Sequence, residues 1–264
     1  MTATAFLFSM PSGIPGAISR QQFTVVEPQN LDSAKPFGSY GIPGYISGSK
    51  FVPVDSSLGN SSVYGFLVRA YPTQGANPSD PLSTAVPKTS GTIDIMRRGY
   101  MTVLLNAGTA VLDGQAYVRT ANPSTGKPVG GIEATQEWGS SSASKSGGGN
   151  TGNGTLVLDA TSPVQPNAIA GAYTINCITA STNAATFRVS DPMGRVLGDV
   201  SFSGSGASAT FNDQIKFAVT DGSTDFVVGD GFVVTVVANT LAIPRCRFQG
   251  AADATGNVEL AFNI

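Results

Sequence analysis

Residues 94–107 read "DIMRRGYMTVLLNA", and two adjacent arginines, Arg97 and Arg98, stand at the start of its apolar part. The pair is conspicuous because Lys and Arg supply only 15 of the 264 residues, and charged residues only 12%. Met101 and Val103 then alternate with their neighbours, and a period of two is typical of a β-strand. The stretch therefore predicts a β-strand in which two arginines precede the alternating apolar residues.

The same alternation recurs along the chain, whereas the three-and-four spacing of an amphipathic helix is seldom sustained. Further alternating segments are 66–71, 116–119, 173–177, 215–219 and 232–236. The 32 glycines and 16 prolines separate short strands with turns, and "DPMG" at 191–194 suits a type I turn. We predict an all-β protein with a small β-barrel or β-sandwich body and a second β-sandwich module.

A change of composition divides the chain into these two parts. The run "GSSSASKSGGGNTGNGT" provides flexibility and little burial, so we predict a flexible Gly/Ser linker over 139–157. The alternating segments that follow predict an inserted, outward-projecting β-sandwich module over 158–240. Residues 258–264 alternate to the last position and predict a strand that pairs with the first module. The body is therefore expected to comprise 1–138 together with 241–264.

The absence of histidine restricts the chemistry of this chain most strongly. Without histidine there is no Ser-His-Asp or Cys-His catalysis and no zinc site that contains His. Two cysteines, Cys177 and Cys246, are too few for a four-cysteine zinc site, and whether they form a disulfide stays open. Asp-Gly and Gly-Asp pairs near Asp221 and Asp230 are typical of hairpin turns rather than of a calcium loop. We predict no catalytic residue, cofactor or metal site.

Charge and hydropathy exclude two classes of partner. The net charge of −2 and the sequence pI near 5.1 provide no cationic surface of the kind that binds nucleic acid. No apolar run approaches the roughly 18 residues that a membrane span needs. The start, "MTATAFLFSMPSGIPG", lacks the basic segment of a signal peptide, so we expect synthesis in a cytoplasm and an N-terminal arm or strand.

Two interpretations of the arginine pair remain open. In the first, Arg97 and Arg98 are solvated residues at a strand entry. In the second they anchor an interface together with Tyr100, because Arg and Tyr are enriched at interface cores. Side chains alternate across a strand, so at most one of the two arginines is expected on the side of Tyr100.

Trp138, the only tryptophan, is the fourth candidate interface residue. It stands beside the expected linker, where it is either an aromatic anchor for a partner or part of a core. Glu133 and Glu137 are the only pair of acids that suggests glycoside cleavage, which needs two carboxylates about 5–10 Å apart in a cleft.

The segment "GTIDIMRRGYMTVLLNAGTAVLDGQAYVRTANPSTGKPVGGIEA" resembles the family of tailed-phage structural cement proteins, also called capsid decoration proteins. The end, "CRFQGAADATGNVELAFNI", and the early "KPFGSYGIPGYI" are also similar to that family. The segment "GAYTINCITAS…FRVSDPMGRVLGDV…FAVTDGSTDFVVGDGFVVTV" resembles a module inserted in many phage virion proteins. The resemblance covers roughly residues 90–264.

This resemblance implies a virion structural protein that binds the major capsid protein on the outer surface of an icosahedral phage head. It carries over no catalytic residue and implies no cofactor. We also expect self-association, with a trimer first and a dimer second.

Two other functions stay open at this point. A tail-fibre or adhesin component would bind carbohydrate through the 158–240 module, and stacking aromatics should then appear on one of its faces. The aromatic residues of that module mostly follow the alternation of a core. An enzyme is the remaining alternative, and it rests on Glu133 and Glu137 alone.

Overall fold

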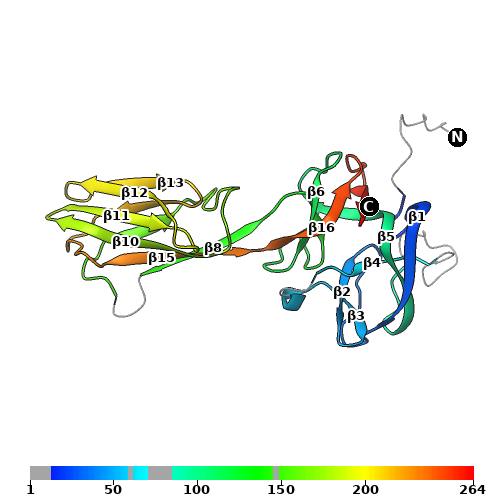
Figure 1. Cartoon of the computed structure of the whole chain (residues 1–264). Coiled ribbons are helices and arrows are strands. Elements are labelled where there is room, and N and C mark those ends of the chain that lie inside the picture. The colour runs from blue at the N-terminus through cyan, green and yellow to red at the C-terminus, as the bar shows by residue number, and fades with distance from the viewer. Residues whose placement is uncertain (1–12, 59–61, 71–84, 145–148) are drawn as a thin grey trace. The chain divides into compact units, whose positions relative to one another are not determined.

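A computed structural model of the chain describes residues 13–58, 62–70, 85–144 and 149–264. Within these residues the regular structure is β-strand, apart from one 3-10 turn, η1 (Ser56–Leu58), so the predicted all-β class is confirmed. The chain divides into two compact units (Figure 1). Unit 1 contains Met1–Glu137 and Asn239–Ile264, and unit 2 contains Trp138–Ala238.

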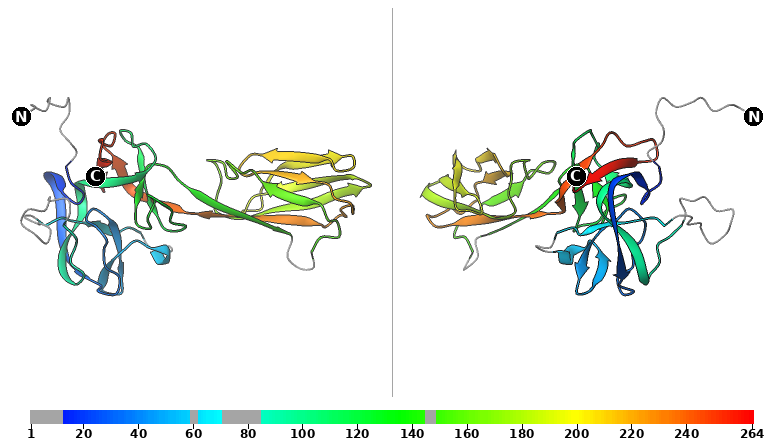
Figure 2. Two further views of the ribbon diagram at one scale, coloured as in Figure 1. Left: turned by 180° about the vertical axis from the view of Figure 1, so that it is seen from behind. Right: turned by 45° about the vertical axis from the view of Figure 1, so that its right-hand side comes forward.

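Unit 1 is built on one nine-stranded sheet with the order β1-β3-β2-β4-β5-β17-β16-β6-β7. Its strands are β1 (Ile18–Leu31), β2 (Pro43–Ser47), β3 (Lys50–Pro53), β4 (Gly65–Leu67), β5 (Gly91–Ala107), β6 (Gln115–Arg119), β7 (Ile132–Glu133), β16 (Thr240–Phe248) and β17 (Asn257–Phe262). Two further pairings, β1 with β5 and β5 with β7, close the sheet into two rings of strands. The 17-residue strand β5 belongs to both rings (Figures 1 and 2).

The apolar side chains of the two rings form two clusters. Every strand of the first ring contributes to one cluster, which includes Leu31, Ile46, Phe51, Leu67 and Ile95. Every strand of the second ring contributes to another, which includes Met101, Ala116, Ile132, Phe248 and Leu260. Burial of each large apolar side chain contributes about 1.5–3 kcal/mol to folding.

The middle of β5 is buried on both faces. Ile95 packs in the first cluster and its neighbour Met96 in the second, and both are fully buried. A strand that is covered on both sides has a continuous apolar sequence rather than an alternating one. This is why the two residues before the arginines, Ile95 and Met96, are both apolar, while clear alternation begins only after Tyr100.

Unit 2 is a β-sandwich of a five-stranded and a three-stranded sheet, which lie face to face (Figures 1 and 2). The larger sheet has the order β12-β11-β10-β15-β8 and the smaller one β13-β14-β9. The strands are β8 (Trp138–Ser144), β9 (Thr155–Leu158), β10 (Gly171–Ser181), β11 (Ala184–Ser190), β12 (Val196–Ser203), β13 (Ser208–Asn212), β14 (Lys216–Thr220) and β15 (Gly231–Ala238). Alternate residues of both sheets, such as Tyr173, Phe187 and Phe217, form one core between them.

The predicted linker is wrong at its two ends, 139–144 and 155–157, where the structure has strands, and its residues 145–148 lie outside the described part of the chain. Trp138–Ser144 forms β8, which pairs with β15 from Trp138 opposite Ala238 to Ser144 opposite Phe232. Thr155–Leu158 forms β9, which pairs with β14. The ladder of a sheet is made by backbone groups, so a Gly/Ser-rich segment can occupy an edge position next to the apolar strand β15. Unit 2 therefore includes residues 139–157.

Two local predictions agree with the structure. The strand at the C-terminal end of the sequence, β17, pairs with β5 of unit 1. The turn at Asp191 has the expected hydrogen bond from Gly194 N to Asp191 O, at 2.9 Å. The Asp191 carboxylate also accepts hydrogen bonds from the backbone N–H groups of Met193 and Arg195.

Candidate interaction surface

The stretch Arg97–Tyr100 lies in the shared strand β5, opposite an irregular part of β1. Arg20 pairs with Tyr100 and Val25 with Arg98, so residues 21–24 of β1 face Gly99 alone. Gly99 has a φ of +136°, and a Cβ there would lie 2.6 Å from Oγ1 and 3.1 Å from Cα of Thr24. Only glycine allows this close approach of the two strands. The bulge also interrupts the regular alternation of side chains along β1.

Arg20 covers Tyr100 on this face of the sheet. Its guanidinium carbon lies 4.3 Å from the centre of the Tyr100 ring. Nε and Nη2 of Arg20 donate to the two carboxylate oxygens of Glu259 at 2.9 and 2.6 Å, and Ser19 Oγ donates to Oε1 at 2.6 Å. The hydrogen bonds to Glu259 raise the pKa of Arg20 above its usual value. Glu259 therefore holds a cation flat on an aromatic ring.

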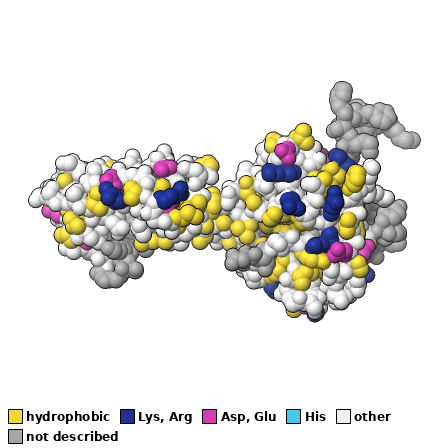
Figure 3. Space-filling model, in the orientation of Figure 1, with side chains coloured by type: hydrophobic (Ala, Val, Ile, Leu, Met, Phe, Trp, Pro, Cys, Tyr) yellow, Lys and Arg dark blue, Asp and Glu magenta, His cyan; other side chains and the backbone are white. Residues whose placement is uncertain are grey.

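Two arginines near Tyr100 have no such partner. Tyr100, Ala261 and Arg247 are opposite one another on β5, β17 and β16, and residues in register across strands share a face. Arg98 stands two positions before Tyr100 on β5 and pairs with Val25 of β1. Both Arg98 and Arg247 are exposed, and neither forms an ion pair within the described part of the chain. Figure 3 shows Lys and Arg side chains among hydrophobic ones on the visible face of unit 1.

Exposed apolar side chains lie next to these cations. Val25, opposite Arg98, is 45% exposed, and Phe23 in the bulge is 65% exposed with a φ of +66°. A bulky residue with positive φ is rare and is held there by its surroundings. We call the set Arg20, Phe23, Val25, Arg98, Tyr100 and Arg247 the cationic sheet face.

Arg97 takes a different place from its neighbour. Its guanidinium carbon lies 3.4 Å from the centre of the Tyr64 ring, and Nη1 donates to the Tyr64 carbonyl oxygen at 2.7 Å. Glu27 Oε2 lies 3.7 Å from Arg97 Nε and accepts the Tyr64 hydroxyl at 2.8 Å. Arg97 and Arg98 therefore lie in two different environments.

Trp138 belongs to unit 2, where it is the first residue of β8. Its side chain is half-buried and packs against the core of the sandwich. The structure thus brings together Arg98 and Tyr100 among the four candidate residues, and assigns Trp138 to a different unit.

Glu133 and Glu137, the acids considered for catalysis, share one arginine. Arg119 is fully buried, and its Nε and Nη2 donate to the Glu133 carboxylate at 2.6 and 3.1 Å. Nη2 also donates to Glu137 Oε2 at 2.6 Å, and Lys127 pairs with the same oxygen. The hydrogen bond from Arg119 lowers the pKa of Glu137. A carboxyl group held in its anionic form in this way is poorly suited to act as a general acid.

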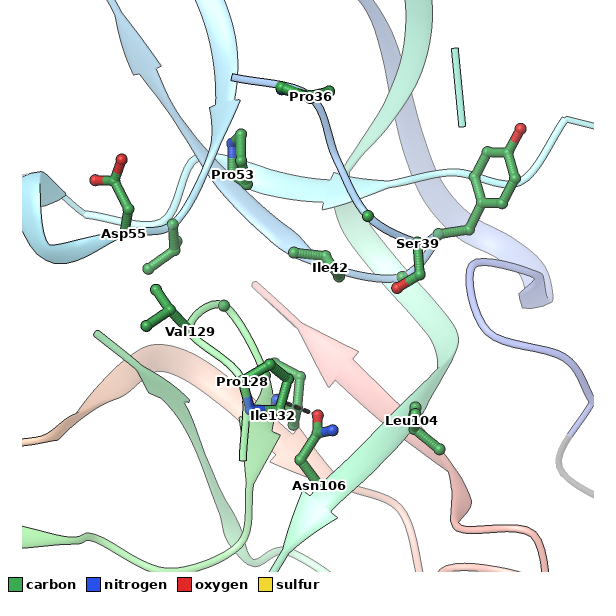
Figure 4. A pocket seen from close by; sticks show the side chains of 16 residues that line it. Pro36, Ser39, Ile42, Pro53, Asp55, Leu104, Asn106, Pro128, Val129 and Ile132 are labelled. Carbon is green, nitrogen blue, oxygen red and sulfur yellow. Dashed lines mark hydrogen bonds between the residues drawn. The ribbon is translucent and has the colours of Figure 1, made fainter. Parts of the chain in front are cut away.

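Unit 1 also has an apolar groove of about 440 Å³ between the two rings (Figure 4). Figure 4 shows Pro36, Pro53, Pro128 and Val129 around it, with Leu104 and Asn106 on the β5 side. Two of its polar side chains, Asn106 and Asp55, are already engaged. Asn106 Oδ1 accepts the N–H of Ile132 at 3.1 Å, and Asp55 accepts a hydrogen bond from Lys35 Nζ at 2.7 Å. The groove is suited to an apolar group rather than to an ion.

Asp221, Asp225 and Asp230 bind backbone N–H groups in separate places, and Asp221 Oδ2 accepts that of Gly206 at 3.4 Å. Asp230 accepts the N–H groups of Thr151, Gly152 and Val227, whereas Asp225 accepts that of Asn183. Among the described residues no group of three or more His, Cys, Asp or Glu is placed to hold a metal ion.

Two further findings concern the cysteines and membrane spans. Cys177 and Cys246 are both buried free thiols, which answers the question of a disulfide that the sequence left open. None of the helical segments in the described residues is long and apolar enough to cross a membrane.

The residues that sequence analysis missed are Arg20, Phe23, Arg247 and Glu259. Arg20 and Glu259 are separated by 239 positions, so no local pattern connects them. Arg247 did have a signal, because "RCRF" alternates charged and apolar residues in the way of a strand with one exposed face.

Comparison with known proteins identifies the family. No curated protein and no solved structure matches this chain. The sequence model of one family, described as the XM1 gp53 minor capsid protein, matches residues 3–176. The match includes the strand that carries the arginine pair and the whole segment up to Arg119 and Glu137, and it covers more than half of the chain. The chain therefore belongs to the XM1 gp53 minor capsid protein family.

Proposed function

We propose that this protein decorates the outer surface of an icosahedral phage head and binds the major capsid protein through the cationic sheet face of unit 1. As a member of a phage minor capsid family, the chain is a capsid-related structural protein. The observation that carries the finer proposal is the cationic sheet face itself. It combines exposed arginines that lack an ion-pair partner within the described residues with an exposed Phe and an Arg-covered Tyr.

The composition of this face suits a protein interface. Arg, Tyr and Phe are enriched where interfaces are fully desolvated, and Arg pairs with carboxylates through two parallel hydrogen bonds. An exposed arginine contributes little to folding, but one that is covered by a partner with a carboxylate contributes specificity and affinity. We expect self-association, with a trimer as the first choice and a dimer as the second. Either would repeat the contact around a symmetry axis and increase avidity.

Charge is divided unevenly between the units. Unit 1 contains 11 Lys or Arg and 10 Asp or Glu, a difference of +1, and unit 2 contains 4 and 7, a difference of −3. The two differences sum to the net charge of −2. We propose that unit 1 contacts the capsid and that the more acidic unit 2 faces solvent, where net charge favours solubility.

The test uses phage heads that lack this protein. Purified full-length chain is added, and bound protein and the temperature of head rupture are measured. Binding to the assembled shell should raise the rupture temperature by mass action. The double variant Arg98→Ala with Arg247→Ala should bind at least about tenfold more weakly. Arg188→Ala, an exposed arginine on β11 of unit 2, is the matched control and should bind like the wild type.

Two outcomes would refute the proposal. Either the wild-type chain fails to bind the heads and leaves their rupture temperature unchanged, or the double variant binds as tightly as the wild type while remaining folded. The second outcome would reject the cationic sheet face while keeping the protein on the head.

The carbohydrate alternative finds no specific support. The seven Tyr and Phe residues of the sandwich core, Tyr173, Phe187, Phe202, Phe211, Phe217, Phe226 and Phe232, are all buried. A sugar-binding face needs an exposed aromatic platform, and within the described part of unit 2 the only aromatic side chain outside that set is the half-buried Trp138. We also propose that the chain is not an enzyme, because Glu133 and Glu137 are both paired with Arg119.

A further inference from the structure

A second cavity of unit 1, of about 650 Å³, is lined by two arginines and, within the described residues, by no acidic side chain. Arg97 comes from β5 and Arg245 from β16, and these strands lie on either side of β17. Tyr64, Phe262 and Asn263 form other parts of the wall. The cavity is on the side of Arg97, so it is distinct from the cationic sheet face.

Asn263 joins the backbones of both arginines. Its backbone N–H donates to the Arg245 carbonyl oxygen at 2.8 Å, and its side-chain Nδ2 donates to the Arg97 carbonyl oxygen at 2.9 Å. Asn263 and Arg245 both have left-handed backbones, with φ of +57° and +52°. Non-glycine residues in this conformation cluster at functional sites, and here two of them meet at one cavity.

The Arg97 guanidinium is oriented but incompletely bonded. The Tyr64 ring lies beneath it, and the Tyr64 carbonyl oxygen accepts its only hydrogen bond among the described residues. Its Nε is buried and makes no hydrogen bond, because Glu27 Oε2 is 3.7 Å away. A buried N–H without an acceptor is costly, so a small movement that brings an oxygen within hydrogen-bonding distance of Nε would be favoured, and Arg97 Nη2 is left without a partner among the described residues.

Arg245 lies in an irregular part of β16. The register of β16 against β6 shifts between Ala242 and Arg247, and Pro244 and Arg245 lie in the shifted segment. The Arg245 side chain is exposed, and no hydrogen bond or ion pair engages it within the described part of the chain. Its five N–H donors are therefore available to a ligand in the cavity.

We propose that this cavity, the Arg97–Arg245 pocket, binds a carboxylate, and that on the phage head it takes an Asp or Glu side chain of the major capsid protein. The identity of that partner rests on the proposed function, whereas the preference for a carboxylate rests on the pocket alone. A planar guanidinium matches a carboxylate with two parallel hydrogen bonds, and Tyr64 holds one of the two guanidiniums in a fixed plane. A phosphate backbone is the poorer fit, because it is bound by rows of cations on a basic surface, and this chain is acidic overall.

The first test examines the pocket without the phage head. Full-length protein labelled with ¹⁵N at arginine is titrated with hexaglutamate, with hexaglutamine and with inorganic phosphate. The Nε–H signals of Arg97 and Arg245 should shift in a saturable manner with hexaglutamate and not with hexaglutamine. Arg245→Gln should abolish the shift of the Arg97 signal, whereas Arg188→Gln should leave it unchanged. Absence of a shift with hexaglutamate, or a response to phosphate alone, would overturn the proposal.

The second test asks whether the pocket contributes on the head. Arg245→Gln should bind heads at least about tenfold more weakly than the wild type, and Arg245→Lys should recover part of that loss because it keeps the charge. Equal binding by Arg245→Gln and the wild type would show that the pocket is not used there. This result differs from failure of the proposed function, in which the wild-type chain itself does not bind.

Discussion

Arg119 is completely buried, yet every nitrogen of its guanidinium group has an acceptor. Nε and Nη2 bind the two glutamates, and Nη1 donates to the carbonyl oxygens of Ala121 and Asn122 at 3.3 and 3.0 Å. The sequence showed the acids but not the arginine between them, because Arg119 precedes Glu133 by 14 positions. A pair of acids that is close in sequence suggested catalysis, whereas their common partner gives them a structural role.

Removal of Arg119 should destabilise unit 1 strongly. Arg119→Met keeps most of the side-chain volume but leaves the Glu133 carboxylate buried without its cation. Loss of one member of a buried ion pair costs about 3–5 kcal/mol in the free energy of unfolding. Arg188→Met breaks the exposed pair with Asp199 and should change the same quantity by less than about 1 kcal/mol. Urea unfolding followed by circular dichroism measures both. A loss below about 1 kcal/mol in Arg119→Met would contradict the assigned role.

Asp55 should make the stability of unit 1 sensitive to acid. Burial alone would raise the pKa of this carboxyl group, but hydrogen bonds from Lys35 and from Ser57 outweigh it and hold the pKa at about 2, below the ordinary 3.8. Because the folded pKa is lowered, Asp55 contributes fully above about pH 4, and its contribution is lost as the pH falls towards 2.

The variant Asp55→Asn isolates this contribution. Its free energy of unfolding should be lower than that of the wild type near neutral pH, and the difference should shrink between about pH 4 and pH 2. Thermal or urea unfolding at several pH values measures the difference. A gap between wild type and variant that stays constant over this range would rule out the ion pair with Lys35 as its cause.

At the level of strands, alternation of apolar residues was a sound guide where one face is buried and a poor one elsewhere. It located the second half of β5, together with β17, β10, β14 and β15, because the side chains there face a core on one side. It missed β8, whose Ser and Gly residues lie at the edge of a sheet and pair through the backbone alone. It could not find the cationic sheet face either, since that face is assembled from β1, β5, β17 and β16 by long-range pairing.

The bulge of β1 over β5 provides a test at this level. Gly99→Ala adds a methyl group where Thr24 already stands, and it also forces a positive φ on alanine. Backbone strain of this kind costs about 1–3 kcal/mol, before the steric conflict is added. Gly126→Ala is the control, because Gly126 has a φ of +78° with open space around its Cβ position. Calorimetry should therefore show a clearly larger loss of stability for Gly99→Ala, and equal losses would mean that Thr24 does not confine this glycine.

On the scale of the whole chain, unit 2 is an insertion between two positions of unit 1 that are already in contact. Asn239 N donates to the Glu137 carbonyl oxygen at 2.9 Å, and Glu137 N donates to Thr240 Oγ1 at 2.8 Å. Each unit has its own core, since the apolar clusters of unit 1 and of unit 2 have no residue in common. The units should therefore fold independently, as insertions at close-lying chain positions do.

Excision of unit 2 tests whether the units fold independently, and it also tests our proposal that unit 1 alone contacts the capsid. Residues 138–238 are replaced by Asn-Gly, a two-residue turn that can join paired strands. The shortened chain should keep its β-structure by circular dichroism and should bind phage heads with the affinity of the full chain, because the cationic sheet face and the Arg97–Arg245 pocket both belong to unit 1. The separate unit Trp138–Ala238 should fold and should not bind heads. If the shortened chain folds but no longer binds, the capsid contact involves unit 2, and if it does not fold, the body depends on its insertion.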